Sequence, residues 1–180
     1  MDNEWQRNFR NRLHDFEAKH RRPPGTVPVS IKIRVNLGCY HREHSPHAYS
    51  FIDKYLNELG TYDDFTFEEH ESGPELLVFV ATTTAGISLA KSIIDLVIAI
   101  IKARSEGIKK GDRRTAPLEL IVRRANDRGE FREEMVLRVE HGETINQEVI
   151  EECLRQSISV LLRKEEDKPT SQTQHKAGRG

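Results

Sequence analysis

The feature that most constrains the fold is one long apolar stretch, Leu76 to Ile101, which carries Lys91 and Asp95 in its middle. A bilayer span needs roughly 20 mostly apolar residues, so this stretch is long enough to cross a membrane. Acidic residues precede it and basic residues follow it, which would place the basic flank in the cytoplasm. One interpretation is therefore a single-span membrane protein in which Lys91 and Asp95 form a pair inside the bilayer.

Three observations favour a soluble domain instead. Each charge inside a span costs about 2.5–3.5 kcal/mol on insertion scales, and a pair four residues apart reduces that cost without cancelling it. A span at 76–101 would also separate the predicted strands into fragments too small to be stable. The small and polar residues step by three or four, which is typical of a helix over 83–104 that lies across a sheet. The residues of this stripe are Thr84, Ser88, Lys91, Asp95, Ala99 and Lys102.

Alternating hydrophobicity predicts the sheet. Residues 27–37 alternate apolar and polar without a miss, which indicates a strand with one face on a core. A short strand around 65–67 is flanked by acidic residues, which commonly protect a sheet edge. Residues 118–122 and 131–139 are joined by turn residues and predict a hairpin. We therefore expect an α+β fold: a small four-stranded, mainly antiparallel sheet with two or three helices packed on one face. Residues 76–81 are alternatively a short strand before the long helix.

The chain is expected to divide into three segments, because its 180 residues fit one domain plus tails. Residues 1–25 form an amphipathic helix and a linker, and residues 26–164 form a single α+β domain. Helices are predicted at 48–59 and 145–163, the second with a capping box of Thr144 and Gln147. Residues 165–180 are polar and lack apolar periodicity, which predicts a disordered tail.

The N-terminal helix carries the candidate partner-binding residues. Trp5, Phe9, Leu13 and Phe16 recur at steps of four, four and three and share one helical face. This face packs on its own domain, binds a partner protein as an arm, or lies weakly on a membrane surface. The first residues contain no apolar signal core, so no cleaved secretory signal is expected and the cytoplasm is the expected compartment.

One loop is dense in potential metal ligands. Cys39, His41, His44 and His47 lie within nine residues, and thiolate and imidazole groups are the ligands that zinc prefers. However, Pro46 interrupts the helix that would bring the three histidines together. We favour a solvated loop and expect no metal or cofactor. A small metal-binding protein that uses these four residues stays as an alternative.

The sequence shows no catalytic signature. It contains no GxSxG, HExxH or phosphate-binding glycine loop, which favours a protein that is not an enzyme. The net charge of −1 gives no general attraction to nucleic acid. The basic loop at 102–114 has no interleaved aromatic residue, so base stacking is not indicated. These observations favour a protein-interaction adaptor as the function.

The order of the predicted elements resembles the effector-associated constant component domains of bacterial conflict systems. The segments that carry the resemblance are IKIRVNL, TTTAGISLAKSIIDLVIAIIKAR, LELIVRR, EEMVLRVE and INQEVIEECLRQSISVLL, over residues 27–163. The resemblance implies a small α+β accessory component of the bacterial cytoplasm that bridges or regulates an effector without being an enzyme. Its partner would be an effector protein or a regulator of one. The Trp5 helix and the histidine-rich loop depart from a minimal domain of this kind.

Overall fold

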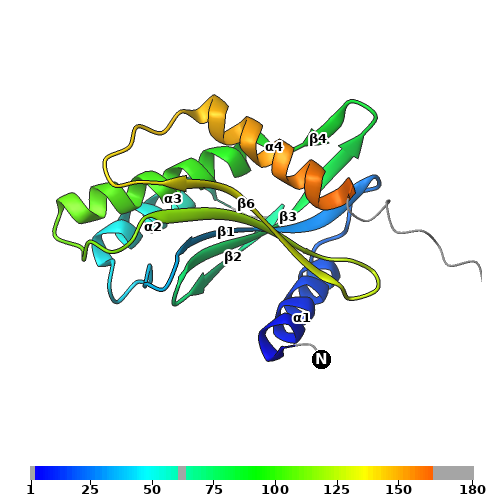
Figure 1. Cartoon of the computed structure of the whole chain (residues 1–180), viewed down its shortest axis with the longest axis horizontal. Coiled ribbons are helices and arrows are strands. Elements are labelled where there is room, and N and C mark those ends of the chain that lie inside the picture. The colour runs from blue at the N-terminus through cyan, green and yellow to red at the C-terminus, as the bar shows by residue number, and fades with distance from the viewer. Residues whose placement is uncertain (1–2, 61–63, 164–180) are drawn as a thin grey trace, which may run out of the picture.

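The structure is a computed structural model that describes residues 3–60 and 64–163. Within these ranges the chain forms helices and strands in alternating groups (Figure 1). The helices are α1 (Glu4–Lys19), α2 (Pro46–Leu59), α3 (Lys91–Lys109) and α4 (Gln147–Arg163). The strands are β1 (Thr26–Val35), β2 (Phe65–His70), β3 (Gly73–Thr83), β4 (Gly86–Ser88), β5 (Leu118–Ala125) and β6 (Phe131–Val139).

The strands form one six-stranded antiparallel sheet in the order β2-β3-β1-β5-β6, with β4 paired to β3 beside this path. The predicted α+β class and the hairpin of β5 and β6 are confirmed. The predicted count of four strands is wrong, because the described residues contain six. Of the two additional strands, β3 contains the alternative short strand at 76–81, and β4 lies in the segment that was expected to begin the long helix.

The apolar stretch 76–101 is two structures rather than one. Residues 76–83 belong to strand β3, a short hairpin with β4 follows, and the helix begins at Lys91 instead of residue 83. β3 reads as continuously apolar because both of its faces are buried: Leu76 and Val78 face the main core, while Leu77 faces α1. Across residues 3–60 and 64–163, no helix combines the length and the apolar character needed to cross a membrane. In the described chain, residues 76–101 are thus divided between two strands and a helix and do not form one continuous helix.

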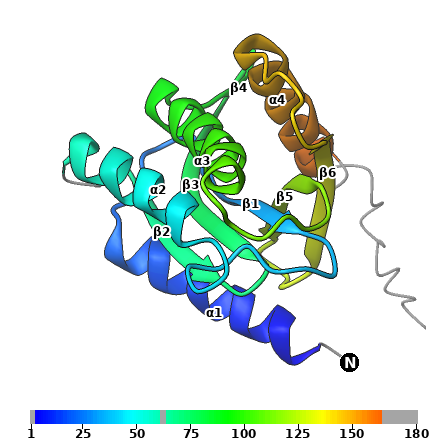
Figure 2. The same cartoon turned by 90° about the vertical axis from the view of Figure 1, so that its left-hand side faces the viewer.

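Helices cover both faces of the sheet (Figure 2). Apolar residues of α2, α3 and α4 pack on one face and form the main core with β1, β3 and β5. Helix α1 packs on the opposite face, which we call the α1 side. There it forms a second, smaller core. Its members are Phe9, Leu13, Phe16 and Leu77, with Phe79, Ala125 and Phe131 packed against them.

The start of α4 depends on a contact that the sequence pattern did not indicate. In α4 the side chain of Asn146 accepts hydrogen bonds from the backbone N–H groups of Glu148 and Val149, at 2.9 and 3.3 Å, so Asn146 takes the capping role expected of Thr144. The expected disordered tail, residues 165–180, lies outside the described residues, as does residue 164 at the end of the predicted domain.

Candidate functional site

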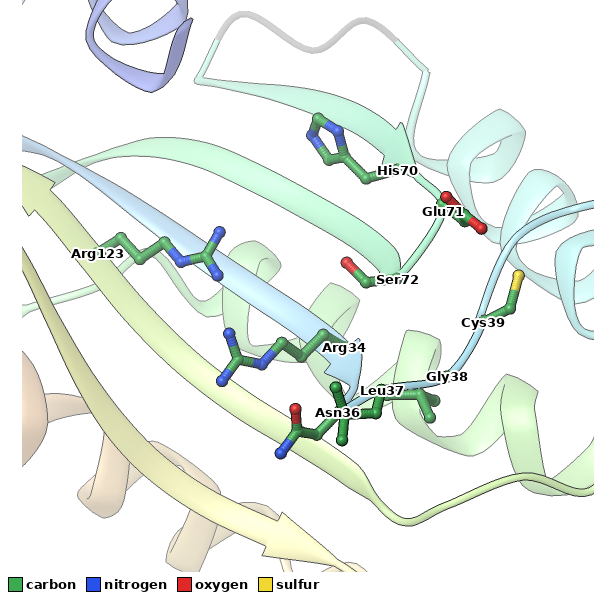
Figure 3. Close-up of a pocket in the computed structure, with 10 residues that line it drawn as sticks. Arg34, Asn36, Leu37, Gly38, Cys39, His70, Glu71, Ser72 and Arg123 are labelled. Atoms are coloured by element: carbon green, nitrogen blue, oxygen red, sulfur yellow. The ribbon is translucent and has the colours of Figure 1, made fainter. Parts of the chain in front are cut away.

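Helix α1 covers only part of its side of the sheet, and the remainder is an open hollow of about 700 Å³. We call it the open hollow. Figure 3 shows side chains from β1, β2 and β5 on this side, next to the loop that follows β1. Its lining consists of residues 34–39, residues 70–72 and Arg123. The strands and turns that carry these residues are held by the sheet, so the hollow is a preformed feature of the fold.

One wall of the hollow is fixed by backbone hydrogen bonds. The turn between β2 and β3 accepts N–H groups from the end of β1: Val35 donates to Ser72 at 2.9 Å, and Tyr40 donates to Glu71 at 3.0 Å. Gly73 closes this turn at a φ of +141°, and a Cβ atom there would collide with the Ile33 carbonyl oxygen. The close approach of the turn to β1 therefore requires glycine at this position.

Leu37 lies at the rim of the hollow with an unusual backbone conformation and an exposed side chain. It has a φ of +55°, a left-handed conformation that non-glycine residues rarely adopt. Its side chain is fully exposed, at 102% of the reference area. An apolar side chain in this position contributes nothing to the core and carries a backbone cost of about 1–3 kcal/mol. Such strain concentrates at binding sites, where the surrounding structure holds the residue in place.

Two arginines on neighbouring strands line the same hollow. Arg34 donates from Nε to Glu119 at 3.1 Å, and Arg123 donates from Nε to Glu133 at 2.8 Å. These contacts orient both guanidinium groups on the α1 side of the sheet (Figure 3). The Arg123 guanidinium also lies 5.7 Å from the Trp5 ring centre, which links the hollow to the first turn of α1.

A partly buried charged cluster lies where α1 meets the hollow. Arg12 of α1 contacts Glu68, lies 2.9 Å from His70 Nε2 and donates to Glu75 at 2.9 Å, all through its Nη1 atom. His70 Nε2 is in turn 3.0 Å from Glu75 and 3.3 Å from Glu68. Ser30 donates to Glu75 through its hydroxyl. We call Arg12, Glu68, His70 and Glu75 the charged cluster.

The cluster shifts the protonation of its members. Burial opposes ionisation of Glu75, but the hydrogen bond from His70, the charge of Arg12 and the Ser30 hydroxyl outweigh it and hold the pKa of Glu75 well below its usual range. Hydrogen bonds to Glu68 and Glu75 raise the pKa of His70. Next to the cluster, Lys32 donates to the Gly73 carbonyl at 2.5 Å, and burial lowers the pKa of Lys32 to about 7.

The predicted metal-ligand loop does not gather into one site. Cys39 Sγ lies 2.9 Å from His44 Nδ1, whereas His47 Nδ1 lies 2.7 Å from Asp112. Asp112 also accepts the backbone N–H groups of His47 and Ala48 and so caps the start of α2. His47 therefore takes part in the contacts that hold this helix start. His41 accepts the backbone N–H of Glu43 through Nδ1 at 3.5 Å. In this structure the four side chains therefore contact different partners and do not converge on one point.

The predicted pair of Lys91 and Asp95 is not buried. Lys91 is exposed at the first position of α3 and Asp95 is half-buried. Asp95 accepts a hydrogen bond from Gln147 of α4 at 3.2 Å. Because α3 begins at Lys91, this residue lies at the helix start and not in the centre of an apolar span.

Three of the four predicted partner-binding residues lie in the second core. Phe9, Leu13 and Phe16 are buried between α1 and the sheet, so a partner reaches them only if α1 leaves the sheet. Trp5 differs, because 44% of its surface is exposed beside Phe131 and Arg123. This places the arm on its own domain, and the partner-binding role of its face stays a prediction.

Sequence reasoning missed the charged cluster. Glu68 and His70 are two residues apart on β2 and therefore share a face, and the β2–β3 register sets Glu68 opposite Glu75. The turn residues Ser72 and Gly73 were the available signal for this hairpin. The acidic residues were interpreted only as protection of an edge strand, and nothing in the local pattern brought Arg12 to them.

Comparisons with family models, with curated proteins and with solved structures gave no match.

Proposed function

We propose that this protein is a non-enzymatic interaction module that binds a partner protein across the open hollow. The observation that carries the proposal is Leu37, an apolar side chain that is fully exposed and held at a positive φ. Folding alone gives no reason to keep leucine there, since glycine or asparagine fits this conformation with less strain. Contact with a partner supplies that reason.

The α1 side of the sheet carries residue types that are typical of protein interfaces. Trp5 and Met135 are also exposed, and the register with Ile121 sets Met135 on the α1 side of the sheet. Arg123 and Arg34 line the open hollow together with Leu37, and Arg123 lies 5.7 Å from the Trp5 ring centre. Aromatic residues, methionine and arginine are the residue types enriched in interface cores.

The lining of the hollow favours a partner segment that carries acidic side chains. Arg34, Arg123 and His70 line it together with one acidic lining residue, Glu71, and the Nε atoms of the two arginines donate to Glu119 and Glu133 beside it. Arginine recognises carboxylates through paired hydrogen bonds, so carboxylates of the partner would meet the two guanidinium groups. An apolar side chain of the same segment would cover Leu37. Following the resemblance to conflict-system components, we propose an effector or its regulator as this partner and the bacterial cytoplasm as its location.

The test is site-specific photo-crosslinking in the source cells. A photoreactive side chain replaces Leu37 in one variant and Val149 in a matched control, because Val149 is an exposed apolar residue of α4 on the helix-covered face. We expect a single protein adduct from position 37 that is absent from position 149 and is competed by excess unlabelled protein. Adducts that are equal at both positions, or that resist competition, would overturn the proposal.

A further inference from the structure

Three potential metal ligands converge at the hairpin of β2 and β3. One donor atom each from Glu68, His70 and Glu75 lies within 4.8 Å of the other two. His70 Nε2 is 3.3 Å from the Glu68 oxygen and 3.0 Å from the Glu75 oxygen. Ligand atoms of a tetrahedral metal ion with bonds of about 2.0–2.2 Å lie about 3.3–3.6 Å apart. The spacing is therefore close to that of a three-ligand metal site.

The position between the three donor atoms is occupied by the guanidinium group of Arg12. A single nitrogen, Nη1 of Arg12, contacts all three residues. The Arg12 side chain is 28% exposed, so its guanidinium can swing into solvent. Helix α1 would keep its place meanwhile, because Phe9, Leu13 and Phe16 hold it on the sheet independently of Arg12. A metal ion could thus exchange with the guanidinium without local unfolding.

The supporting contacts are those of a metal site. Glu75 is 1% exposed and its Oε1 accepts the Ser30 hydroxyl, which orients Oε2 toward His70 and Arg12. Hydrogen bonds to the far oxygen of a ligating carboxylate serve the same purpose in metalloproteins. His70 also lines the open hollow, which gives an ion a route from solvent and leaves room for water as a further ligand.

We propose that Glu68, His70 and Glu75 bind a first-row divalent transition-metal ion, which takes the place of the Arg12 guanidinium. One imidazole nitrogen and two carboxylate oxygens form a donor set that suits Zn²⁺ and its neighbours. The metal site shares only His70 with the lining of the open hollow, and the interaction proposed there depends mainly on Leu37, Arg34 and Arg123. Either proposal can fail without the other.

The test is calorimetric titration of the full chain with Zn²⁺, with metal content checked after dialysis. We expect one ion per chain in the wild type. Arg12→Met keeps the aliphatic stem and removes the competing cation, so binding should become at least about tenfold tighter. Glu68→Gln and His70→Gln remove ligands and should weaken binding by at least about tenfold. Far-UV circular dichroism and Trp5 fluorescence confirm that each variant is folded, and Glu68 is half-exposed on an edge strand, where the amide is tolerated.

The control is a Cys39→Ser/His44→Asn double variant, because this thiol–imidazole pair is another place where Zn²⁺ could bind. We expect the double variant to bind Zn²⁺ as the wild type does, and Co²⁺ to show no thiolate-to-metal charge-transfer band. The proposal is wrong if Arg12→Met binds no ion or binds it no tighter than the wild type. It is equally wrong if Glu68→Gln has no effect, or if binding is lost with Cys39 and His44.

Discussion

At the scale of single residues, the α1 side of the sheet shows why alternation alone does not reveal burial. The strict alternation of β1 predicted that Ser30 and Lys32 would face away from the core, and they do. Both are nevertheless buried, at 0% and 2% exposure, because the charged cluster and α1 cover them. A lysine in such a position is stable only with a hydrogen-bond partner, which the Gly73 carbonyl provides.

The buried lysine gives a pH dependence with a definite sign. The pKa of Lys32 is about 7 when folded and 10.5 when free, so between these values the unfolded state binds more protons. The contribution of Lys32 to stability therefore rises with pH across this window, by at most about 1.4 kcal/mol per pH unit. We expect Lys32→Met to remove this slope, measured as the free energy of unfolding in urea at pH 7.5 and 9.5.

The comparison of the two proteins cancels the contributions of groups that the Lys32 charge does not affect. His70 acts in the opposite direction: its pKa is raised in the folded state, so its stabilising contribution is full below its unfolded pKa and is lost as the pH rises through its folded pKa. Because the Lys32 charge also lowers the pKa of His70, the difference between the two slopes reports on Lys32 together with its effect on His70. Equal slopes for wild type and variant would show that the ammonium is not buried as described.

At the scale of elements, helices and hairpins that have a local sequence signal were predicted. Features that depend on long-range packing were missed. The spacing of Trp5, Phe9, Leu13 and Phe16 correctly indicated α1, and turn residues indicated the hairpin of β5 and β6. β3 was predicted only as an alternative short strand at 76–81, because a strand buried on both faces has no alternation to detect. The charged cluster could not be predicted, since it needs the β2–β3 register and the docking of α1 at once.

Helix α1 should separate from the sheet before the main core unfolds. Phe9 is fully buried in the small second core, and a Phe→Ala change in a core costs about 3–5 kcal/mol. We expect Phe9→Ala to shift the urea transition of Trp5 fluorescence to lower concentration than the far-UV circular dichroism transition, because Trp5 reports on the contact with Phe131. In the control, Phe65→Ala, a main-core residue is truncated and both transitions should shift together. Coincident transitions in Phe9→Ala would show that the two cores unfold as one unit.

At the scale of the whole molecule, the two faces of the sheet have different roles. One face is closed by α2, α3 and α4 and supplies the main core. The other carries α1, the charged cluster and the open hollow, and most of the exposed large apolar side chains lie there: Trp5, Leu37 and Met135, against Val149 elsewhere in the described chain. This asymmetry supports the proposal that the α1 side is the surface that meets a partner. The sequence indicated the arm as the main contact surface and did not indicate Leu37, because the exposure of Leu37 depends on the turn after β1.

The most direct measurement of this claim is the affinity of the partner identified by crosslinking at Leu37, determined by calorimetry for three proteins. Leu37→Asn/Arg123→Gln removes the exposed leucine and one guanidinium of the hollow. The matched control, Val149→Asn/Arg155→Gln, makes the same changes on exposed residues of α4. We expect the Leu37→Asn/Arg123→Gln variant to bind the partner at least about tenfold more weakly than the wild type, as is usual for interface residues of these types. The α4 control should bind with unchanged affinity. Equal affinities for all three proteins, or a loss confined to the α4 variant, would contradict the claim.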